Sequence, residues 1–249
     1  MSMKLAAIIF TLFGSGDPAP AKPATVSKPA ASKPVRVAQG VTAADLVKKV
    51  QEFYKATPQL SAKFRQTTMN VTFGVPTMSD GRVYLKKPGK MRWDYYSKRQ
   101  KNVVTKSQLS DGKTIWVVDK NGKWYYRQDL QKSALPVAVT FLTGTGNLEA
   151  EFTAAIDKSG TYNADARDAH VLKLTPKKPS AQIKNLYLVV DPTNFRVKRS
   201  VVVNAAGDTN QFSFYEPDLQ KAVAEAWFKF DPKAAKGFRE IKEEDASKK

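Results

Sequence analysis

The chain has 249 residues, 42% of them hydrophobic and 10% aromatic, which is enough apolar material for one large β domain or two small ones. It contains no cysteine, which excludes disulfides, thiol catalysis, thiolate metal sites and a lipid-modified N-terminal cysteine, and its single histidine excludes a metal site built from several imidazoles. The formal net charge is +18, so the protein should attract anionic partners such as nucleic acid, lipid headgroups or an acidic protein.

Residues 1–21 are predicted to be a secretory signal peptide, because Lys4 precedes an apolar run from Leu5 to Phe13. Residues 19–21 supply a small-x-small cleavage site, and the apolar run is too short to span a bilayer. The alternative interpretation is a disordered start that is apolar by chance. Residues 22–41 are rich in Pro, Ala and Lys, which predicts a semi-extended linker before the folded domain.

A helix is predicted from Thr42, a good N-cap residue, to about Ala56. Its apolar residues recur at helical spacing and form one stripe that should pack on another element: Ala43, Leu46, Val47, Val50, Phe53 and Tyr54. A second, short helix is expected in the apolar segment that starts at Pro136 and ends near Leu142.

From Leu60 onward the apolar residues recur with period two, which indicates β-strands with one buried face. Turn sequences such as Ser110-Asp111-Gly112 and Lys120-Asn121-Gly122 separate the strands. We therefore predict an α+β fold, mainly antiparallel β, in the form of a barrel or sandwich. The predicted strands are 60–72, 80–87, 90–97, 101–109, 113–119, 123–130, 150–157, 169–175, 183–190, 195–203, 208–215 and one near 226–231.

The stretch from Arg82 to Tyr96 predicts a hairpin with one apolar face around the Pro88-Gly89 turn. Val83 and Leu85 share a face on its first strand, as do Met91, Trp93 and Tyr95 on its second. Lys90, Arg92 and Asp94 occupy the opposite, solvated face. The apolar side chains either form an ordinary core or line a cavity, because a barrel with this many strands can be too wide to fill.

The sequence contains no nucleophile elbow and no phosphate-binding loop. His170 lies in a strand-like stretch without an identifiable nucleophile or orienting residue, and Asp165 and Asp168 are typical of a solvated loop. Basic residues interleave with Trp93 and Tyr95 as in single-strand nucleic-acid binders, but those aromatics are predicted to be buried. We expect no catalytic residue, no metal, no cofactor and no nucleic-acid partner.

Several segments resemble the motifs of a known family, in the family's order and across residues 42–241. They are Phe64-Arg65-Gln66, Gly81 to Pro88, Met91-Arg92-Trp93-Asp94-Tyr95, Ser110 to Trp116, Leu172 to Lys177, and Phe228 to Pro232 with Gly237. These segments are similar to motifs of the periplasmic outer-membrane lipoprotein carrier, LolA. Residues 242–249 remain as a charged tail.

The resemblance implies an open, incomplete β-barrel of about 11 strands, with a helical lid over an apolar cavity that binds lipoprotein acyl chains. Lys87 stands where the family has an arginine that latches the lid, and Met91 stands where it has a phenylalanine tied to loading. Because lysine lacks a planar fork, a latch at Lys87 should be weaker, and the alternative interpretation of Lys87 is a solvated turn residue. The expected acyl-chain-binding residues are Leu46, Val50, Phe53, Phe64, Val83, Leu85, Met91, Trp93, Trp116, Val139, Phe141 and Leu142.

The family likeness also implies partners: lipoproteins, an inner-membrane lipoprotein-releasing ABC transporter and an outer-membrane lipoprotein receptor. We expect a monomer in the periplasm that shuttles lipoproteins between these two and is not an enzyme. The related receptor needs an N-terminal cysteine, which this chain lacks, so the carrier is favoured. The alternatives are a non-shuttling periplasmic lipid-binding or sensor protein of the same fold and, with less support, a basic nucleic-acid-binding protein.

Overall fold

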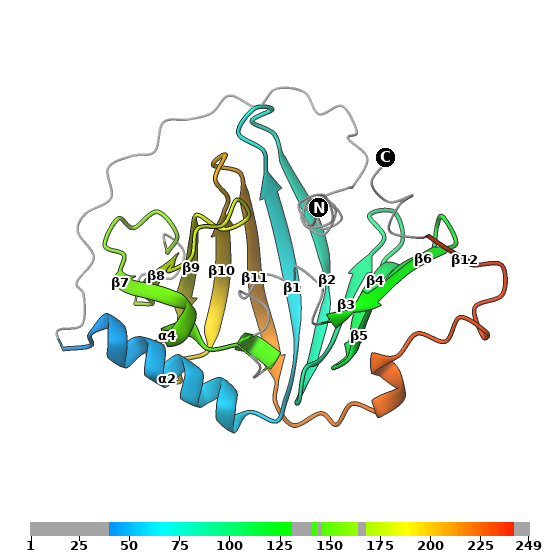
Figure 1. The fold of residues 1–249 in the computed structure, drawn as a ribbon, viewed down its shortest axis with the longest axis horizontal. Coiled ribbons are helices and arrows are strands. Elements are labelled where there is room, and N and C mark those ends of the chain that lie inside the picture. Colours follow the sequence, from blue (N-terminus) through cyan, green and yellow to red (C-terminus); the bar gives the residue numbers. More distant parts are fainter. Residues whose placement is uncertain (1–39, 131–140, 144–145, 164–167, 242–249) are drawn as a thin grey trace.

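A computed structural model describes residues 40–130, 141–143, 146–163 and 168–241. Its centre is one sheet of twelve strands in the order β12-β6-β5-β4-β3-β2-β1-β11-β10-β9-β8-β7, curved and not closed upon itself (Figure 1). Every pairing is antiparallel except that of β12 with β6. The predicted α+β class with a mainly antiparallel, open sheet is therefore confirmed.

The strands follow the predicted period-two segments closely. Their bounds are β1 Gln59–Met69, β2 Pro76–Lys86, β3 Lys90–Tyr96, β4 Val104–Asp111, β5 Thr114–Asp119, β6 Trp124–Asp129, β7 Phe152–Ile156, β8 His170–Pro176, β9 Asn185–Val190, β10 Val197–Val203, β11 Thr209–Asp218 and β12 Arg239–Glu240. The last strand expected near 226–231 is wrong: that segment holds the 3-10 helix η3, Glu225–Phe228, and the strand comes later, as β12.

Helix α2, Ala43–Ala56, begins where the sequence predicts. Thr42 and Asp45 form a capping box, in which Thr42 accepts from the Asp45 amide at 3.1 Å while the Asp45 carboxylate accepts from Thr42. Two short elements follow β6: the 3-10 helix η2, Phe141–Thr143, and α4, Leu148–Glu151. The sequence did not predict α4, whose first turn is capped by Asn147. Most of the short helix predicted from Pro136 lies outside the described residues.

The sheet has two faces with different coverings. The inner face is the one covered by α2, and it carries the main apolar cluster. Cross-strand register places the alternating residues of neighbouring strands on it together, for example Leu60 opposite Leu85, and Leu85 opposite Met91. The core of the protein is thus the space between α2 and the inner face.

The outer face of β2 to β6 is covered by residues 219–240, which we call the C-terminal strap (Figure 1). Its Phe228 is fully buried in a small cluster with Tyr84 and Val223. The face of β3 that carries Lys90, Arg92 and Asp94 was predicted to be solvated, but the strap covers it and Asp94 is buried. Lys86, Lys90 and Arg92 alternate with the residues of the inner face. They therefore point outward, where they contact the strap.

Candidate functional site

The candidate site is the interface between α2 and the inner face of the sheet. Helix α2 buries its apolar stripe, formed by Leu46, Val47, Val50 and Tyr54, against the strands. The Tyr54 ring meets Phe141 of η2 edge-on, with centroids 5.4 Å apart. Two separate segments, α2 and η2, therefore cover the inner face together.

Tyr54 fixes the C-terminal half of α2 to the sheet. Its hydroxyl accepts a hydrogen bond from the Val197 amide at 3.2 Å, and burial raises its pKa well above the usual tyrosine value. Gln51, three residues before Tyr54, accepts from the Leu148 amide at 2.7 Å and joins α2 to α4. These polar contacts position the helix, whereas its apolar stripe supplies the buried area.

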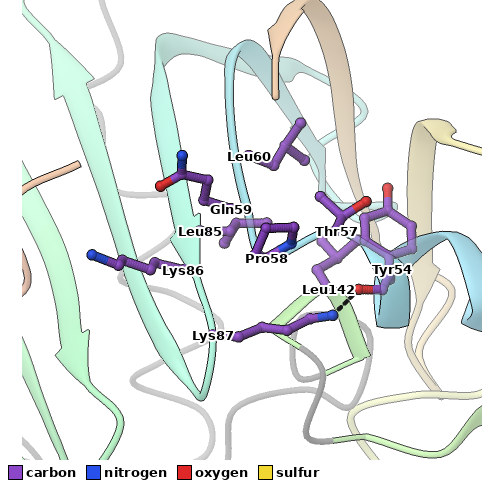
Figure 2. A pocket seen from close by; sticks show the side chains of 9 residues that line it. All are labelled: Tyr54, Thr57, Pro58, Gln59, Leu60, Leu85, Lys86, Lys87 and Leu142. Carbon is purple, nitrogen blue, oxygen red and sulfur yellow. Dashed lines mark hydrogen bonds between the residues drawn. The ribbon is translucent and has the colours of Figure 1, made fainter. Parts of the chain in front are cut away.

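Lys87 lies directly after β2, and its side chain reaches the C-terminal end of α2 (Figure 2). The ammonium donates to the carbonyls of Tyr54 and Lys55, the latter at 2.7 Å. A cation at a helix C-terminus is favoured by both the free carbonyls and the helix dipole. Partial burial and the neighbouring Lys55 ammonium lower the pKa of Lys87.

Two small pockets run along the seam between α2 and the sheet. One is lined by Tyr54, Leu60, Leu85, Lys87 and Leu142, among others (Figure 2). The second continues from it toward Phe214 on β11. Each encloses about 10 Å³, roughly the room for one water molecule. At these two places along the seam, the described side chains leave little free space.

The structure brings most of the predicted acyl-chain-binding residues into one cluster on the inner side. Buried together are Leu46, Val50, Phe64, Val83, Leu85, Met91, Trp93, Phe141 and Leu142, and Phe53 packs against them half-buried. Val139 lies outside the described residues. The cluster is the common surface of the sheet and its two covering segments.

Trp116 is the exception, and its assignment to the same surface is wrong. The register pairs Trp116 with Leu109, whereas its neighbour Ile115 pairs with Ser110 in the row of Met91. Trp116 therefore faces outward, where it is buried in a second cluster beneath the C-terminal strap. Alternation within β5 cannot show which of its two apolar rows points inward.

Strand β11 contributes an aromatic group that was not among the predicted site residues. Phe212 packs on both Phe64 and Trp93, with centroids 5.8 and 5.1 Å apart, and Phe214 lies half-buried beside it. Phe212 and Phe214 alternate in the sequence, but only the pairing of β11 with β1 places them next to the family-like motif. These rings extend the apolar surface across the middle of the sheet.

The inner face also carries polar groups. The Gln66 carbonyl oxygen, the Tyr95 hydroxyl and the Gln128 amide nitrogen are buried, without a hydrogen-bond partner among the described residues. Lys106 projects from the same face, with its ammonium 5.6 Å from the centre of the Tyr95 ring. Burial lowers the Lys106 pKa to about 8. The inner face is therefore mainly apolar, with Gln66, Tyr95 and Lys106 lying toward the β1–β2 turn and Gln128 lying level with Met91.

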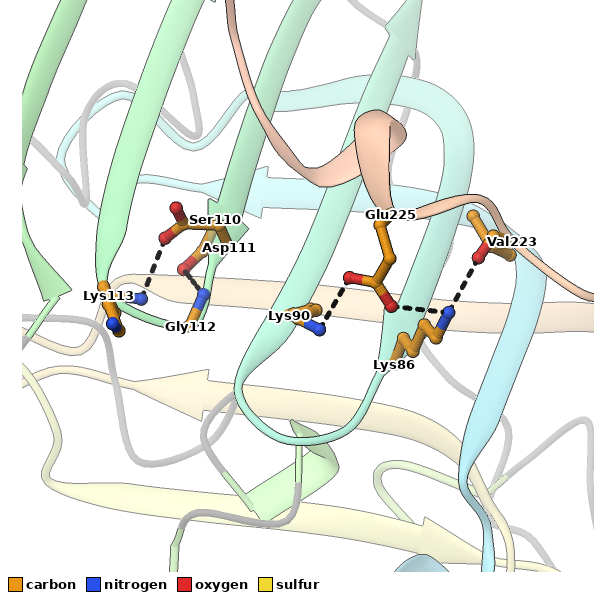
Figure 3. A network of polar contacts seen from close by, with 8 residues as sticks. All are labelled: Lys86, Lys90, Ser110, Asp111, Gly112, Lys113, Val223 and Glu225. Atoms are coloured by element: carbon orange, nitrogen blue, oxygen red, sulfur yellow. Dashed lines mark hydrogen bonds and ion pairs between the residues drawn. The ribbon is translucent and has the colours of Figure 1, made fainter.

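The hairpin between β2 and β3 is held from the outer side as well (Figure 3). Lys86 and Lys90 both pair with the Glu225 carboxylate, at 2.7 and 2.6 Å, and Lys86 also donates to the Val223 carbonyl. The two ammonium groups lower the pKa of Glu225 to about 2. One hairpin thus contacts α2 through Lys87 and the C-terminal strap through its two other lysines.

The turn between β4 and β5 supports this hairpin. Gly112 adopts φ +93°, and a Cβ there would come within 2.9 Å of the Pro88 carbonyl oxygen, so glycine is required on both counts. Hydrogen bonds from the Gly112 and Lys113 amides to the Ser110 and Asp111 side chains shape the turn (Figure 3). The turns at Pro88 and Gly112, which belong to two different family-like motifs, are therefore adjacent in space.

Nowhere in the described ranges do three or more His, Asp or Glu side chains come close enough to hold a metal ion. Among the helices of the same residues, none combines the length and apolarity needed to cross a bilayer. Trp93 and Tyr95, the aromatics considered for nucleic-acid stacking, are both buried.

Comparison with known proteins identifies the family. A sequence model of the family described as outer membrane lipoprotein carrier protein LolA matches residues 55–231. An outer-membrane lipoprotein carrier protein of Dechloromonas aromatica is 26% identical over 193 residues, which cover 77% of this chain and 86% of the relative. Another from Chromobacterium violaceum is 27% identical over 199 residues, covering 79% and 89%.

A solved structure has a similar fold: that of an uncharacterized conserved protein from Thermus thermophilus. It aligns with a TM-score of 0.50 at 11% identity, over 80% of this chain and 98% of that one. The family match covers most of the described domain, including the C-terminal end of α2, the hairpin that carries Lys87 and the first part of the strap. The chain belongs to the LolA family of outer-membrane lipoprotein carrier proteins.

Proposed function

We propose that this protein is a periplasmic carrier that takes up lipoprotein acyl chains between α2 and the inner face of the sheet. The observation that carries the proposal is a continuous apolar surface whose covering helix is held at its C-terminal end by a single cation, Lys87. Such a cover can be displaced without unfolding the sheet, because the strands are joined by their own ladder.

In this proposal, α2 moves away from the sheet to admit the cargo. The seam pockets hold about 10 Å³ each, far less than an acyl chain needs. An acyl chain in water costs about 0.8 kcal/mol per methylene, which is on the order of 10 kcal/mol for a long chain. When α2 and η2 swing away, the exposed inner face becomes an equivalent apolar surface, and the acyl chains replace Leu46, Val50 and Tyr54 as its cover.

The polar end of the inner face gives the bound cargo an orientation. The groups of Gln66 and Tyr95, which lie nearer the β1–β2 turn than Leu85 and Met91 do, can bond the ester and amide groups where acyl chains join the lipoprotein terminus. The acyl chains would then lie along the apolar row toward Met91 and Leu85. Binding is non-directional along the chains and directional only at this end, which suits cargoes with different proteins attached.

In this proposal the carrier receives lipoproteins from an inner-membrane ABC transporter and delivers them to an outer-membrane receptor. The support is the family membership, together with relatives that bear the carrier name and align over most of their length. The role needs no catalytic group, because cargo enters and leaves by exchange between apolar surfaces.

A binding experiment tests the proposal. The protein is mixed with a tripalmitoylated lipopeptide or with the same peptide lacking acyl chains, and complexes are separated from micelles by size exclusion. We expect only the acylated peptide to co-elute. Phe214→Ser, on the inner face, should weaken retention several-fold, whereas Tyr215→Ser, its exposed neighbour on the opposite face, should leave it unchanged.

Mass spectrometry of material copurified from the cell envelope separates the carrier from its alternative. Recovery of acylated lipoproteins supports the carrier. Recovery of free lipid alone supports a non-shuttling lipid-binding protein. Equal retention of both peptides, or equal loss in both variants, would overturn the assignment of the inner face.

A further inference from the structure

The tip of the β1–β2 hairpin is a second apolar surface, far from the inner face. Of the large apolar side chains exposed on the described residues, five lie between β1 and the start of β2: Met69, Val71, Phe73, Val75 and Met78. Phe73 is 78% exposed, and Val71 and Val75 are more than half exposed. Several apolar side chains gathered at one exposed tip indicate a contact surface.

The tip projects beyond its neighbours. Strand β3 ends beside Gly81, so β2 continues for five residues, Pro76 to Asp80, without a partner on that side. At about 3.4 Å per residue, this edge of β2 is unpaired over roughly 17 Å, while β1 stays paired with β11 up to Met69. Figure 1 shows the β1–β2 hairpin reaching past the adjacent loops.

Hydrogen bonds hold the backbone of the tip in a defined conformation. Asn70 accepts hydrogen bonds from the Thr72 and Phe73 amides through its side chain and from the Gly74 amide through its carbonyl, at 2.9 to 3.3 Å. The Val71 amide donates to the Asp208 carboxylate of the neighbouring loop at 2.9 Å. Four consecutive backbone donors are therefore satisfied, which lowers the cost of placing this backbone in an apolar medium.

Cations lie on one side of the base of the tip, next to β3 to β6, whereas the β10–β11 loop on the other side carries Asp208. Strand direction places the β3–β4 loop, residues 97–103, and the β5–β6 loop, residues 120–123, at the same end of the sheet as the tip. These loops carry exposed Lys98, Arg99, Lys101, Lys120 and Lys123, with no acidic residue. The loops at the opposite end mix signs, as in Asp191 with Arg196 and Asp157 with Lys158.

We propose that this end of the protein docks on an anionic bilayer, with the tip of the β1–β2 hairpin in the headgroup–acyl boundary. An apolar tip ahead of a set of cations matches a bilayer, in which the phosphates lie outside the hydrocarbon. The tip is convex and the cations lie behind it, so the surface complements a plane of lipid better than the pocket of a partner protein. The inference does not depend on what the inner face binds.

A site-specific experiment tests the docking. Phe73→Trp is introduced into the full chain and mixed with vesicles of brominated phosphatidylcholine containing 30% phosphatidylglycerol, where roughly that fraction gives a physiological surface potential. Quenching is measured relative to the wild-type chain, which accounts for its own tryptophans. The matched control is Leu219→Trp, another exposed apolar position, at the opposite end of the sheet.

We expect Phe73→Trp to be quenched at least tenfold more than Leu219→Trp. The excess quenching should fall at least fivefold without phosphatidylglycerol and when Lys98, Arg99 and Lys101 are replaced by Gln. Equal quenching at both positions would overturn the proposal. So would a blue shift of Phe73→Trp that depends on protein concentration and not on lipid, because it would assign the tip to a second copy. Lipopeptide retention by Phe73→Ser is measured in a separate experiment. It tests only the inner face, so failure of the docking proposal and failure of the proposed function can be told apart.

Discussion

The contact of Lys87 with the end of α2 gives a quantitative prediction. In Lys87→Met the side chain keeps its length and apolar stem but loses the two hydrogen bonds to the Tyr54 and Lys55 carbonyls. A hydrogen bond from a charged group contributes about 1.5–3 kcal/mol when buried. Lys87 is only partly buried, so about 1 kcal/mol for each bond, including the helix-dipole term, is the better figure.

The lid should therefore open more easily by about 2 kcal/mol, which is about 30-fold in its opening equilibrium. Native-state hydrogen exchange measures this opening at the amides of Val50 to Tyr54. The amides of β9, in the middle of the sheet half under α2, serve as the internal reference for global unfolding. Lys48→Met, on the exposed face of the same helix, is the matched control and should change exchange by less than about threefold.

Two results would refute the reasoning. If Lys87→Met and Lys48→Met exchange alike at α2, Lys87 does not hold the lid. If the amides of β9 accelerate as much as those of α2, the substitution weakens the whole fold and the helix is not a separate opening unit.

Three further predictions concern other parts of the structure. Gly81→Ala should lower the free energy of unfolding by about 2–3 kcal/mol in urea titration, because a Cβ would overlap the Asp94 carbonyl and the Phe64 ring; an unchanged midpoint would show that the sheet yields there. Lys106→Met should stabilise by up to about 3 kcal/mol, the equivalent of a pKa lowered from 10.5 to about 8. The cost of the buried ammonium is full below pH 8 and vanishes as the pH rises to 10.5, so wild type and variant should converge over that window, and a constant difference would contradict it. Glu225, with its pKa lowered from 4.5 to about 2, anchors the strap above pH 4.5 and releases it as the pH falls toward 2; Trp227 emission should report that change in wild type but not in Glu225→Gln.

Much of the sheet could be predicted from period-two alternation, but the facing of separate strands could not. Val83, Leu85, Met91 and Trp93 all point inward as predicted, since a short turn links their strands directly. Trp116 was misplaced because β5 is apolar on both faces, one toward α2 and one toward the strap. Only the register with β4 decides between them, and register is a tertiary property.

The end of the chain departs from its predicted structure for a related reason. Phe228 and Phe230 alternate with lysine and aspartate as in a strand, but the segment packs on an existing sheet face and pairs with none of its edges until β12. Alternating apolar residues show that one side of a segment is buried. They do not show whether its backbone hydrogen-bonds to a neighbouring strand. The lid contact of Lys87, by contrast, was predicted from the family motif, since a lysine before Pro88 carries no such signal by itself.

Of the three lysines around Pro88, Lys87 has different partners from Lys86 and Lys90, because side chains alternate between the two faces of a strand. Positions 83, 85 and 87 form one alternating row and positions 84 and 86 form the other, so neighbouring ammonium groups leave the chain in opposite directions. A single-residue insertion or deletion within β2 would exchange the rows. Lys86 would then meet the helix, Lys87 would meet Glu225, and the aliphatic lining would be turned out toward the C-terminal strap. The spacing of this short basic turn is therefore under stricter control than its composition, in which any one lysine resembles the next.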